Sequence, residues 1–392
     1  MTERTGPSRW TRRQFLAKGC RAAAAATLGL PLAAGCTSVP QTPEPKRIAR
    51  TRAPSELRQA MHYRRLDDRR VQCQICFRQC IVSDGQLGFC HNKKNMDGEY
   101  YSLIHSQPCA LQVDPIEKEP VFHMLPGTQI FCVGTASCNS RCKFCQNWEM
   151  SQSTMWQTVN EHATPSEVVQ RAQAAGCPTV SFTYNEPIAF YEYMYDIASL
   201  ARRQGLGAVC HTNGTMLAAP LQQLLEQLHA ITVDLKAFTA DFYRKVCSLE
   251  LAPVLSTLQH VVKSGVHLEI VNLIIPTLND APESIGSMCR WIAETLGPDI
   301  PLHFIRFFPS YRMQRLPPTP IKTLEAAVAI ADEAGLHYVY LGNAPGHPRN
   351  SSFCPTCGAR IIDRRHFTVV ANDVVDGKCR FCGHPIAGVW GI

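Results

Sequence analysis

The sequence predicts an α/β fold, a partial (β/α) barrel with a small cysteine-rich module at each end, in a chain of 392 residues. Residues 130–341 indicate the barrel, because short β-rich runs alternate there with helical patterns, as in βαβ units with a parallel sheet. The cysteines indicate the modules, since eleven of the 19 fall into three groups whose spacing suits metal ligands. This length accommodates one large domain with appendages.

The first segment, residues 1–36, is predicted to be an export signal. Residues 11–18 read TRRQFLAK and resemble a twin-arginine signal, whereas residues 32–36 read LAAGC, like the cleavage box of a lipoprotein. The apolar stretch between them is too short for a transmembrane helix, so membrane contact is expected only through a lipid anchor on Cys36. The alternative is a basic tail that directs nothing, on a cytoplasmic protein.

The positive charge of the chain is confined to its start. Residues 37–70, rich in Pro, Thr and Arg, are predicted to be a flexible linker. Residues 1–70 contain 15 Lys and Arg against 5 Asp and Glu, which leaves 24 against 27 for residues 71–392. The body therefore has no basic footprint, and nucleic acid is not expected as a partner.

Residues 71–125 are predicted to form a module organised by metal. Four cysteines fall within eighteen residues, Gly85 and Gly88 favour turns between the last two, and few apolar residues are available for a core. A structural zinc site is favoured, and a second iron–sulfur cluster or disulfides are the alternatives. The four cysteines are Cys73, Cys76, Cys80 and Cys90.

The central motif is the sequence CNSRCKFC at residues 138–145, which follows an apolar run. Its cysteines, Cys138, Cys142 and Cys145, have a C-x3-C-x2-C spacing that lets three thiolates converge on one metal centre. Thiolates select zinc, copper(I) or iron–sulfur clusters over hard cations. A [4Fe–4S] cluster held by three cysteines keeps one iron open, whereas a structural zinc site needs a fourth ligand such as Cys132.

This spacing, with an aromatic residue before the last cysteine, resembles the cluster loop of radical S-adenosylmethionine (SAM) enzymes. The wider context, DPIEKEP at 114–120, CQNW at 145–148 and SQ at 151–152, resembles the radical SAM member of the AmmeMemoRadiSam system, which is related to glycyl-radical activases. The resemblance extends from about Cys73 to Trp390. It implies a [4Fe–4S] cluster whose open iron is chelated by SAM, and reductive cleavage of SAM to a 5′-deoxyadenosyl radical that abstracts hydrogen from a substrate.

The resemblance also implies partners. An electron donor such as flavodoxin or ferredoxin would reduce the cluster, and proteins with Memo-like and AMMECR-type folds would be encoded alongside. The relation to activases allows a protein substrate, and an enzyme that modifies small molecules or peptides is the alternative within this class. From another class, the chain is an iron–sulfur electron-transfer or metal-binding lipoprotein without SAM chemistry. The sequence identifies no substrate motif and no catalytic residue beyond the cluster ligands.

Residues 126–345 are predicted to form the barrel. Strands are expected at 130–133, 179–183, 208–212, 231–235, 268–275, 302–308 and 338–341, and helices at 164–176, 187–204, 217–228, 254–263, 283–295 and 323–334. In parallel barrels the chemistry lies at the carboxyl ends of the strands. Residues that follow a strand are therefore the candidates for a site.

Candidates for SAM binding follow the second and third strands. Residues 183–187 read TYNEP where many radical SAM enzymes have Gly-Gly-Glu-Pro, which implies that Glu186 binds the SAM ammonium, although larger residues replace both glycines. Residues 211–214 read HTNG and resemble the DTNG of the activases, so Thr212 and Asn213 would make polar contacts to SAM. The structural alternative for Glu186 is a helix N-terminus, where a carboxylate is also favoured.

Further candidates follow the fourth strand and lie on the sixth. Residues 234–236 read DLK, as in the activases, and side chains two apart on a strand face the same side. Because charges facing the covering helices would be costly, Asp234 and Lys236 are expected in the barrel mouth, with Lys236 near the SAM carboxylate or in a structural ion pair. His303 is a candidate for contact with SAM or substrate, and the resemblance implies that Phe144 packs against adenine.

Residues 346–392 are predicted to form a third metal module, similar to a zinc ribbon. Two C-x2-C-Gly units lie 21 residues apart, which is typical of a tetrahedral site with four thiolates. Zinc is the expected metal, a rubredoxin-like iron site has the same ligands, and a pair of disulfides is the alternative. The ligands are Cys354, Cys357, Cys379 and Cys382.

Overall fold

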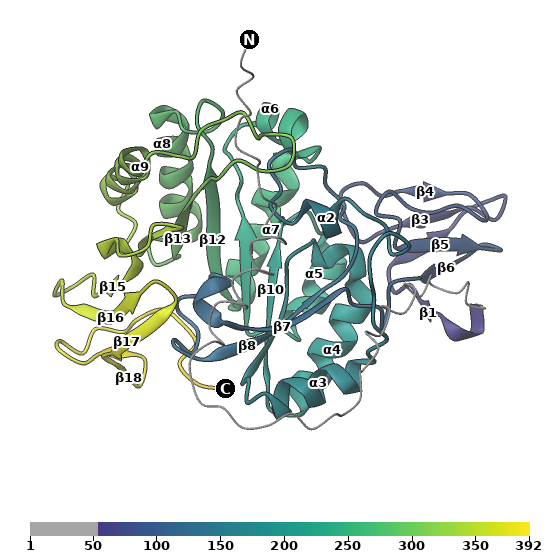
Figure 1. The fold of residues 1–392 in the computed structure, drawn as a ribbon, viewed down its shortest axis with the longest axis horizontal. Helices are drawn as coiled ribbons and strands as arrows, with labels where there is room; N and C mark the ends of the chain where they lie inside the picture. Colours follow the sequence, from purple (N-terminus) through teal and green to yellow (C-terminus); the bar gives the residue numbers. More distant parts are fainter. Residues whose placement is uncertain (1–53) are drawn as a thin grey trace, which may run out of the picture. The chain divides into compact units, whose positions relative to one another are not determined.

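The fold is built on an eight-stranded sheet, drawn near the middle of Figure 1 from a computed structural model that describes residues 54–392. The predicted signal and residues 37–53 of the predicted linker lie outside the described residues. Strands that are neighbours in the sheet are also neighbours along the chain, and all pairs from β8 to β14 are parallel. The strands are β7 (Ala110–Pro115), β8 (Gln129–Gly134), β9 (Thr179–Phe182), β10 (Gly207–Thr212), β11 (Ala230–Asp234), β12 (His267–Ile274), β13 (Leu302–Arg306) and β14 (Val339–Gly342).

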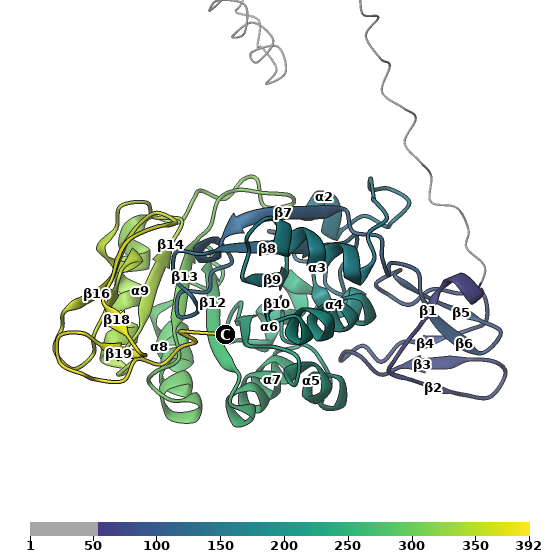
Figure 2. The ribbon, with the colours of Figure 1, turned by 90° about the horizontal axis from the view of Figure 1, so that it is seen from below.

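Helices connect the parallel strands and cover the outer side of the sheet, as Figure 2 shows. The sheet is open, because β7 and β14 form separate edges. The predicted partial (β/α) barrel is therefore confirmed. The helices are α3 (Pro165–Ala174), α4 (Tyr191–Arg203), α5 (Ala218–Leu225), α7 (Leu251–Ser264), α8 (Pro282–Trp291) and α9 (Ile321–Glu333).

Shorter helical segments lie in the connections between these elements. Two of them, η4 and η5, are π-helical turns. None of the helices in residues 54–392 is long and apolar enough to cross a bilayer. The short segments are η1 (Pro54–Glu56), η2 (Ile116–Lys118), α2 (Trp148–Ser151), η3 (Pro187–Phe190), α6 (Ala240–Phe242), η4 (Tyr243–Cys247), η5 (Ile292–Leu296) and η6 (Pro348–Asn350).

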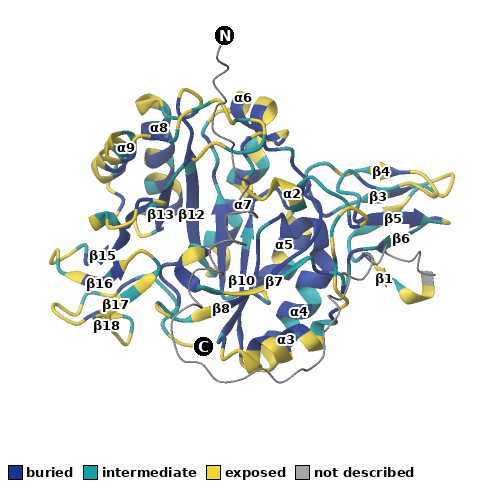
Figure 3. Cartoon of the chain, in the orientation of Figure 1, coloured by how far each residue is buried: buried dark blue, intermediate teal, exposed yellow. Residues whose placement is uncertain are grey.

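Local sequence explains where the barrel elements begin and why they are buried. Helix α3 starts at a capping box, in which Thr164 and Glu167 satisfy each other's backbone N–H groups and Pro165 occupies the first turn. All four residues of β9 are buried, and the central strands form the dark core in Figure 3. Strands that are buried along their whole length, here with the polar residues Thr179 and Ser181 included, are typical of a parallel sheet covered on both faces.

Strand β7 is the element of the central sheet that the sequence did not predict. It pairs antiparallel with β8 over six residue pairs, from Ala110 opposite Gly134 to Pro115 opposite Gln129. Its side chains are intermediate or exposed, because it lies at the edge of the sheet. An edge strand needs neither an apolar run nor strict alternation, so it leaves little trace in the sequence. The predicted boundary between the first module and the barrel, residues 125 and 126, therefore differs from the structure, in which the barrel sheet begins at Ala110.

The amino-terminal module consists of two three-stranded antiparallel sheets around a small core. Its first two strands lie in residues 54–70, which were predicted to belong to the linker. They are rich in exposed arginine side chains, and this composition explains the wrong boundary. The strands are β1 (Arg58–Gln59), β2 (Tyr63–Arg65), β3 (Val71–Cys73), β4 (Ile81–Val82), β5 (Lys93–Met96) and β6 (Glu99–Ser102).

The carboxyl-terminal module is a ribbon of short antiparallel strands, and its buried residues Ile361 and Ile362 belong to one apolar cluster with Phe122, Tyr338 and Tyr340 from the rest of the unit. It is attached to the rest of the unit by Arg364, whose fully buried side chain pairs with Glu117 and donates to the carbonyl oxygen of Phe122 at 2.6 Å. The strands are β15 (Ser352–Phe353), β16 (Arg360–Arg365), β17 (Thr368–Asn372), β18 (Val374–Val375) and β19 (Lys378–Cys379).

Candidate functional site

A cavity of about 780 Å³ lies at the carboxyl ends of the barrel strands. Its walls come from the segments that follow β8, β9, β10 and β11, from β13 and from the ribbon loop at His366 and Phe367. This volume is within the range of cavities that bind cofactors and small molecules. The predicted site residues that line it are Cys138, Cys142, Phe144, Cys145, Glu186, Asn213, Asp234, Lys236 and His303.

The cluster loop, residues 138–145, presents its three cysteines to this cavity. Ser140 Oγ lies 3.1 Å from the sulfur of Cys138 and 3.4 Å from that of Cys142, and the sulfur of Cys145 lies 3.2 Å from Ser151 Oγ. Three thiols at the wall of a cavity with space beyond them are the donor set that a [4Fe–4S] cluster with one open iron requires. The residues present therefore fit this cluster.

The thiol of Cys142 is held ready for metal binding by a residue far along the chain. The Cys247 thiol donates a hydrogen bond to Cys142, which outweighs the effect of burial and lowers the pKa of Cys142 to about 6. Because the thiolate is the form that binds metal, this contact favours cluster assembly. Sequence analysis did not identify Cys247, and its isolated position in the sequence gives no signal of this role.

Cys132, the alternative fourth ligand of a zinc site, does not join the cluster loop. Its thiol donates to Glu119 Oε1 at 3.2 Å, in a separate apolar cluster behind β8. All cysteines within residues 54–392 are free, so the disulfide alternatives have no counterpart in the described structure.

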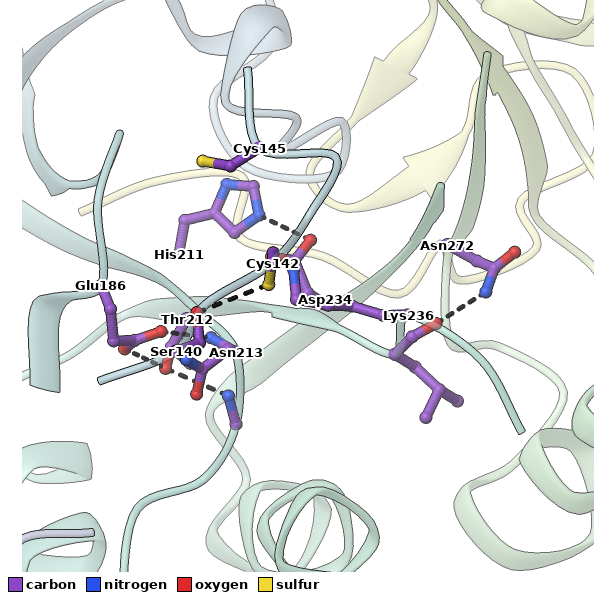
Figure 4. Close-up of polar contacts among 12 residues, drawn as sticks. Ser140, Cys142, Cys145, Glu186, His211, Thr212, Asn213, Asp234, Lys236 and Asn272 are labelled. Atoms are coloured by element: carbon purple, nitrogen blue, oxygen red, sulfur yellow. Dashed lines mark hydrogen bonds and ion pairs between the residues drawn. The ribbon is translucent and has the colours of Figure 1, made fainter. Parts of the chain in front are cut away.

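Glu186 is the acceptor of a dense hydrogen-bond network, shown in Figure 4. Its carboxylate accepts from Thr212 Oγ1 and from the backbone N–H of Asn213, both at 2.7 Å, and from the N–H of Ile188 at 3.1 Å. Burial raises the pKa of Glu186 to about 7, although these hydrogen bonds oppose the shift. The contact with Ile188 makes Glu186 the N-cap of η3, as the structural alternative predicts. Glu186 also lines the cavity, so the two roles are compatible.

Tyr184 keeps the backbone conformation that a glycine would have at this position. Its φ angle is 72°, in the left-handed region that favours glycine, and its hydroxyl donates to Asp114 Oδ2 at 2.7 Å. Gly134 makes room for the ring, because a Cβ atom on Gly134 would lie 2.9 Å from Tyr184 Cδ2. The substitution of the expected glycine is thus accommodated by residues from two other strands.

Thr212 and Asn213 connect strand β10 to the rest of the site. Thr212 lies behind Glu186 and, among the described residues, is not part of the cavity wall. Asn213 lines the cavity, and its side-chain amide donates to Asn139 Oδ1 in the cluster loop at 2.7 Å. Both residues therefore position their neighbours, Thr212 the carboxylate of Glu186 and Asn213 the cluster loop.

Asp234 lies between two cations at the cavity wall. Its carboxylate pairs with Lys236 Nζ at 2.7 Å and with His211 Nε2 at 3.3 Å, and His211 Nδ1 lies 3.7 Å from Glu119. Burial opposes the charge of all these groups, but the mutual attraction outweighs it. The attraction raises the pKa of His211 to about 10, holds that of Lys236 well above its ordinary value and keeps that of Asp234 well below. The cavity wall therefore carries a protonated histidine and an ammonium beside the carboxyl groups of Asp234 and Glu119.

Phe144 and His303 contribute aromatic surface to opposite parts of the cavity. The ring of Phe144 lies 5.7 Å from Lys236 Nζ. His303 Nε2 is 2.5 Å from Glu269 Oε2, and its ring packs on Phe122. Both residues line the cavity.

Eight other cysteines form two further groups. The ribbon site (Cys354, Cys357, Cys379 and Cys382) has four ligand atoms within 4.8 Å of one another, as one tetrahedral metal ion requires. The amino-terminal cysteine site (Cys73, Cys76, Cys80 and Cys90) surrounds a separate cavity of about 20 Å³.

Comparison with known proteins identifies the family. A sequence model of the radical SAM superfamily matches residues 133–291, the segment that contains the cluster loop and most of the cavity wall. The uncharacterized protein MJ0808 of Methanocaldococcus jannaschii is 42% identical over 332 residues, which are 84% of this chain and 99% of that protein. The pyruvate formate-lyase-activating enzyme of Listeria monocytogenes is 23% identical over 178 residues, 43% of this chain and 70% of that enzyme.

Among solved structures, a radical SAM methyltransferase from Sphaerobacter thermophilus is similar with a TM-score of 0.44 and 16% identity, over 55% of this chain and 66% of the methyltransferase. A domain of a pyruvate-formate lyase-activating enzyme from Bacteroides vulgatus is similar with a TM-score of 0.38 and 16% identity, over 42% of this chain and 98% of that domain. The chain belongs to the same family as MJ0808, and its residues 133–291 form a radical SAM superfamily domain.

Proposed function

We propose that this protein is a radical SAM enzyme that cleaves SAM reductively and abstracts hydrogen from a substrate. The observation that carries the proposal is the position of the cluster cysteines. All three line one cavity together with the carboxylate of Glu186 and the charged groups of Asp234 and Lys236. A [4Fe–4S] cluster held there would supply one electron to SAM and an open iron that SAM chelates.

The residues around the cluster would hold SAM by its polar groups. The Glu186 carboxylate is suited to accept from the SAM ammonium, and the cations Lys236 and His211 are suited to the SAM carboxylate. Phe144, in the cluster loop, offers a ring for adenine. Asn213 and Thr212 act indirectly, since they fix the cluster loop and Glu186. Each of these groups binds or orients, and none has to transfer a proton.

The substrate is proposed to be a protein, as for the activases. The similarity to pyruvate formate-lyase-activating enzymes supports this proposal. Membership of the AmmeMemoRadiSam system, with Memo-like and AMMECR-type partners, is proposed on the motifs at 114–120 and 145–148. A flavodoxin or ferredoxin is the proposed reductant, and zinc is the proposed metal of the ribbon site.

The test is the release of 5′-deoxyadenosine from SAM by anaerobically reconstituted protein with dithionite. We expect release by the wild type and none by Cys142→Ala, because two thiolates do not hold the cluster. The remaining alternative is an electron carrier without SAM chemistry. A wild-type protein whose cluster spectrum ignores SAM and which forms no 5′-deoxyadenosine would favour that alternative.

Export by the twin-arginine route, with a lipid anchor, is proposed from residues 11–36, which lie outside the described structure. Fractionation of cells that express a tagged chain tests it, beside the variant Arg12→Lys/Arg13→Lys. We expect the wild type in the membrane fraction and the variant in the cytoplasm. Cytoplasmic location of both would contradict export.

A further inference from the structure

The amino-terminal cysteine site lies directly against the cluster loop. Asn139, the residue after Cys138, lines the cavity of the amino-terminal site. Arg78, from the same module, donates from Nε to the carbonyl oxygen of Asn139 at 2.7 Å. Ser137 Oγ donates to the carbonyl oxygen of Cys90 at 2.6 Å. Cys138, a ligand of the SAM cluster, is therefore directly followed in the chain by a residue that lines the cavity of the second group of four thiols.

The spacing of the thiols differs between the two groups of four. In the ribbon site the sulfurs of Cys354 and Cys382 are 3.6 Å apart and those of Cys357 and Cys379 are 3.8 Å apart. Two sulfurs bound at about 2.3 Å to one tetrahedral ion lie ~3.8 Å apart, so this site has the dimensions of a single ion. Within residues 54–392, the ribbon site is the only such group with all ligand atoms within 4.8 Å.

The four amino-terminal cysteines surround a cavity, and their sulfurs are not as close together as those of the ribbon site. In this they are similar to the three cysteines of the cluster loop, which also border a cavity. A cubane cluster separates its ligands in this way, because each thiolate binds a different iron and the iron–sulfur core fills the space between them. The spacing therefore favours a cluster over the zinc ion that the sequence favours.

Two cations accompany the amino-terminal site. Lys93 lines its cavity with a side chain that is only 2% exposed, and pairs with the fully buried Glu192 at 2.9 Å. Arg78 lines the same cavity, and its guanidinium donates to the carbonyl oxygen of Asn139, the residue beside Cys138. Positive groups offset the cost of burying an anionic thiolate centre, and Arg78 is shared by both sites.

We propose that the amino-terminal cysteine site holds a second [4Fe–4S] cluster, which passes single electrons from a protein donor to the SAM cluster. The proposal rests on the proposed function, because these electrons serve SAM cleavage. With four cysteines, each iron has a protein ligand, so the second cluster has no open position and is suited to electron transfer. The donor, a low-potential one-electron protein, loses one electron. The second cluster gains it and returns to its oxidised state as the SAM cluster is reduced.

The first test counts metals in full-length chains reconstituted with iron and sulfide. The variants are Cys76→Ala and Cys142→Ala, and the control is Cys109→Ala, a partly buried cysteine outside all three sites. We expect about eight irons in the wild type and the control, and about four in each variant, with equal zinc in all proteins. A wild type with about four irons, and a Cys76→Ala variant that loses zinc and no iron, would overturn the proposal.

The second test compares reductants. We expect Cys76→Ala to lose at least about tenfold more 5′-deoxyadenosine formation with reduced flavodoxin than with excess dithionite, which reduces the SAM cluster directly. Equal losses with both reductants would overturn the relay. In a related measurement that needs no variant, the Mössbauer spectrum of the wild type should show about one iron in eight changing on addition of SAM, whereas a change in about one iron in four would contradict a second cluster. Failure of the proposed function is distinct, because the wild type would then form no 5′-deoxyadenosine with either reductant while still containing both clusters.

Discussion

The cluster loop and the ribbon site both consist of cysteines, but they differ in the number of ligands and in their surroundings. The ribbon site has four sulfurs within 4.8 Å of one another, and two of its cysteines, Cys357 and Cys382, are exposed. The cluster loop has three cysteines at the wall of a large cavity. The same wall carries the Asp234 carboxylate and its two cationic partners, Lys236 and His211. A complete set of ligands closes a metal site and stabilises a fold, whereas an incomplete set beside a cavity leaves a position for chemistry.

The largest expected effects come from removing one ligand at each site. Cys145→Ala should abolish SAM cleavage with little change in thermal stability, because the loop is anchored independently through its backbone contacts with Cys247 and Val246. Cys379→Ser should release the ribbon metal and unfold the ribbon, since metal binding supplies much of the folding free energy of such modules.

Measurements of 5′-deoxyadenosine, metal content and hydrogen exchange distinguish these outcomes. The assignment of a structural role to the ribbon site would be contradicted if Cys379→Ser abolished SAM cleavage while its ribbon stayed protected from hydrogen exchange. That result would place the ribbon metal in the chemistry.

The second prediction concerns the attachment of the ribbon to the barrel. Arg364→Met removes the partner of Glu117 and leaves a buried carboxylate without its cation. Breaking a buried ion pair in this way costs about 3–5 kcal/mol of unfolding free energy. Chemical denaturation measures the loss, and the double variant Arg364→Met/Glu117→Gln serves as the control, which should recover most of it. An unchanged midpoint for Arg364→Met would mean that the ribbon is held mainly by its own core.

The barrel could be predicted from the sequence because its strands are buried on both faces. The segment at 130–133, which reads IFCV, is entirely buried, and such strands appear as apolar runs between polar turns. Strands β1, β2 and β7 could not be predicted, because they carry exposed or half-exposed side chains at sheet edges. The position of a strand in its sheet thus decides whether the sequence reveals it.

The residues of the site also divide into those that the sequence reveals and those that it does not. Cys138, Glu186 and Lys236 were found because each belongs to a short motif after a predicted strand. Cys247 was missed, because it reaches the site only through the tertiary fold and acts on a residue from another element. Glu119 belongs to the motif at 114–120, but the motif does not reveal its contact with His211. Contacts between distant segments, such as those that tune the pKa of Cys142, have no local pattern in the sequence.

The third prediction concerns the pH dependence of SAM binding at the cluster loop. Burial raises the pKa of Glu186 to about 7, so this carboxyl group becomes protonated below that pH and loses its attraction for the SAM ammonium. The ionised fraction falls about tenfold between pH 8 and pH 6, and the affinity for SAM should fall by the same factor. Calorimetric titration of the reconstituted protein measures this change, and Glu186→Gln should bind weakly with a flat profile. A wild-type affinity that is constant over this range would exclude Glu186 as the ammonium acceptor.

The smallest effect is expected outside both metal sites, at the start of α3. Thr164→Ala removes the hydroxyl that accepts from the N–H of Glu167 at 3.3 Å, and loss of such a cap costs about 1 kcal/mol. Thr164→Ser keeps the hydroxyl and should retain most of the stability. SAM cleavage should be unchanged in both variants, because α3 covers the outer side of the sheet.

Thr164→Ala also serves as a control for the variants at the two cysteine sites. It shows how much SAM cleavage changes when only the stability of the fold is reduced. If Thr164→Ala lowered SAM cleavage, a similar decrease in Cys379→Ser would reflect global stability. If it does not, any decrease caused by Cys379→Ser can be assigned to the ribbon loop at the cavity wall, where His366 and Phe367 would contact the substrate.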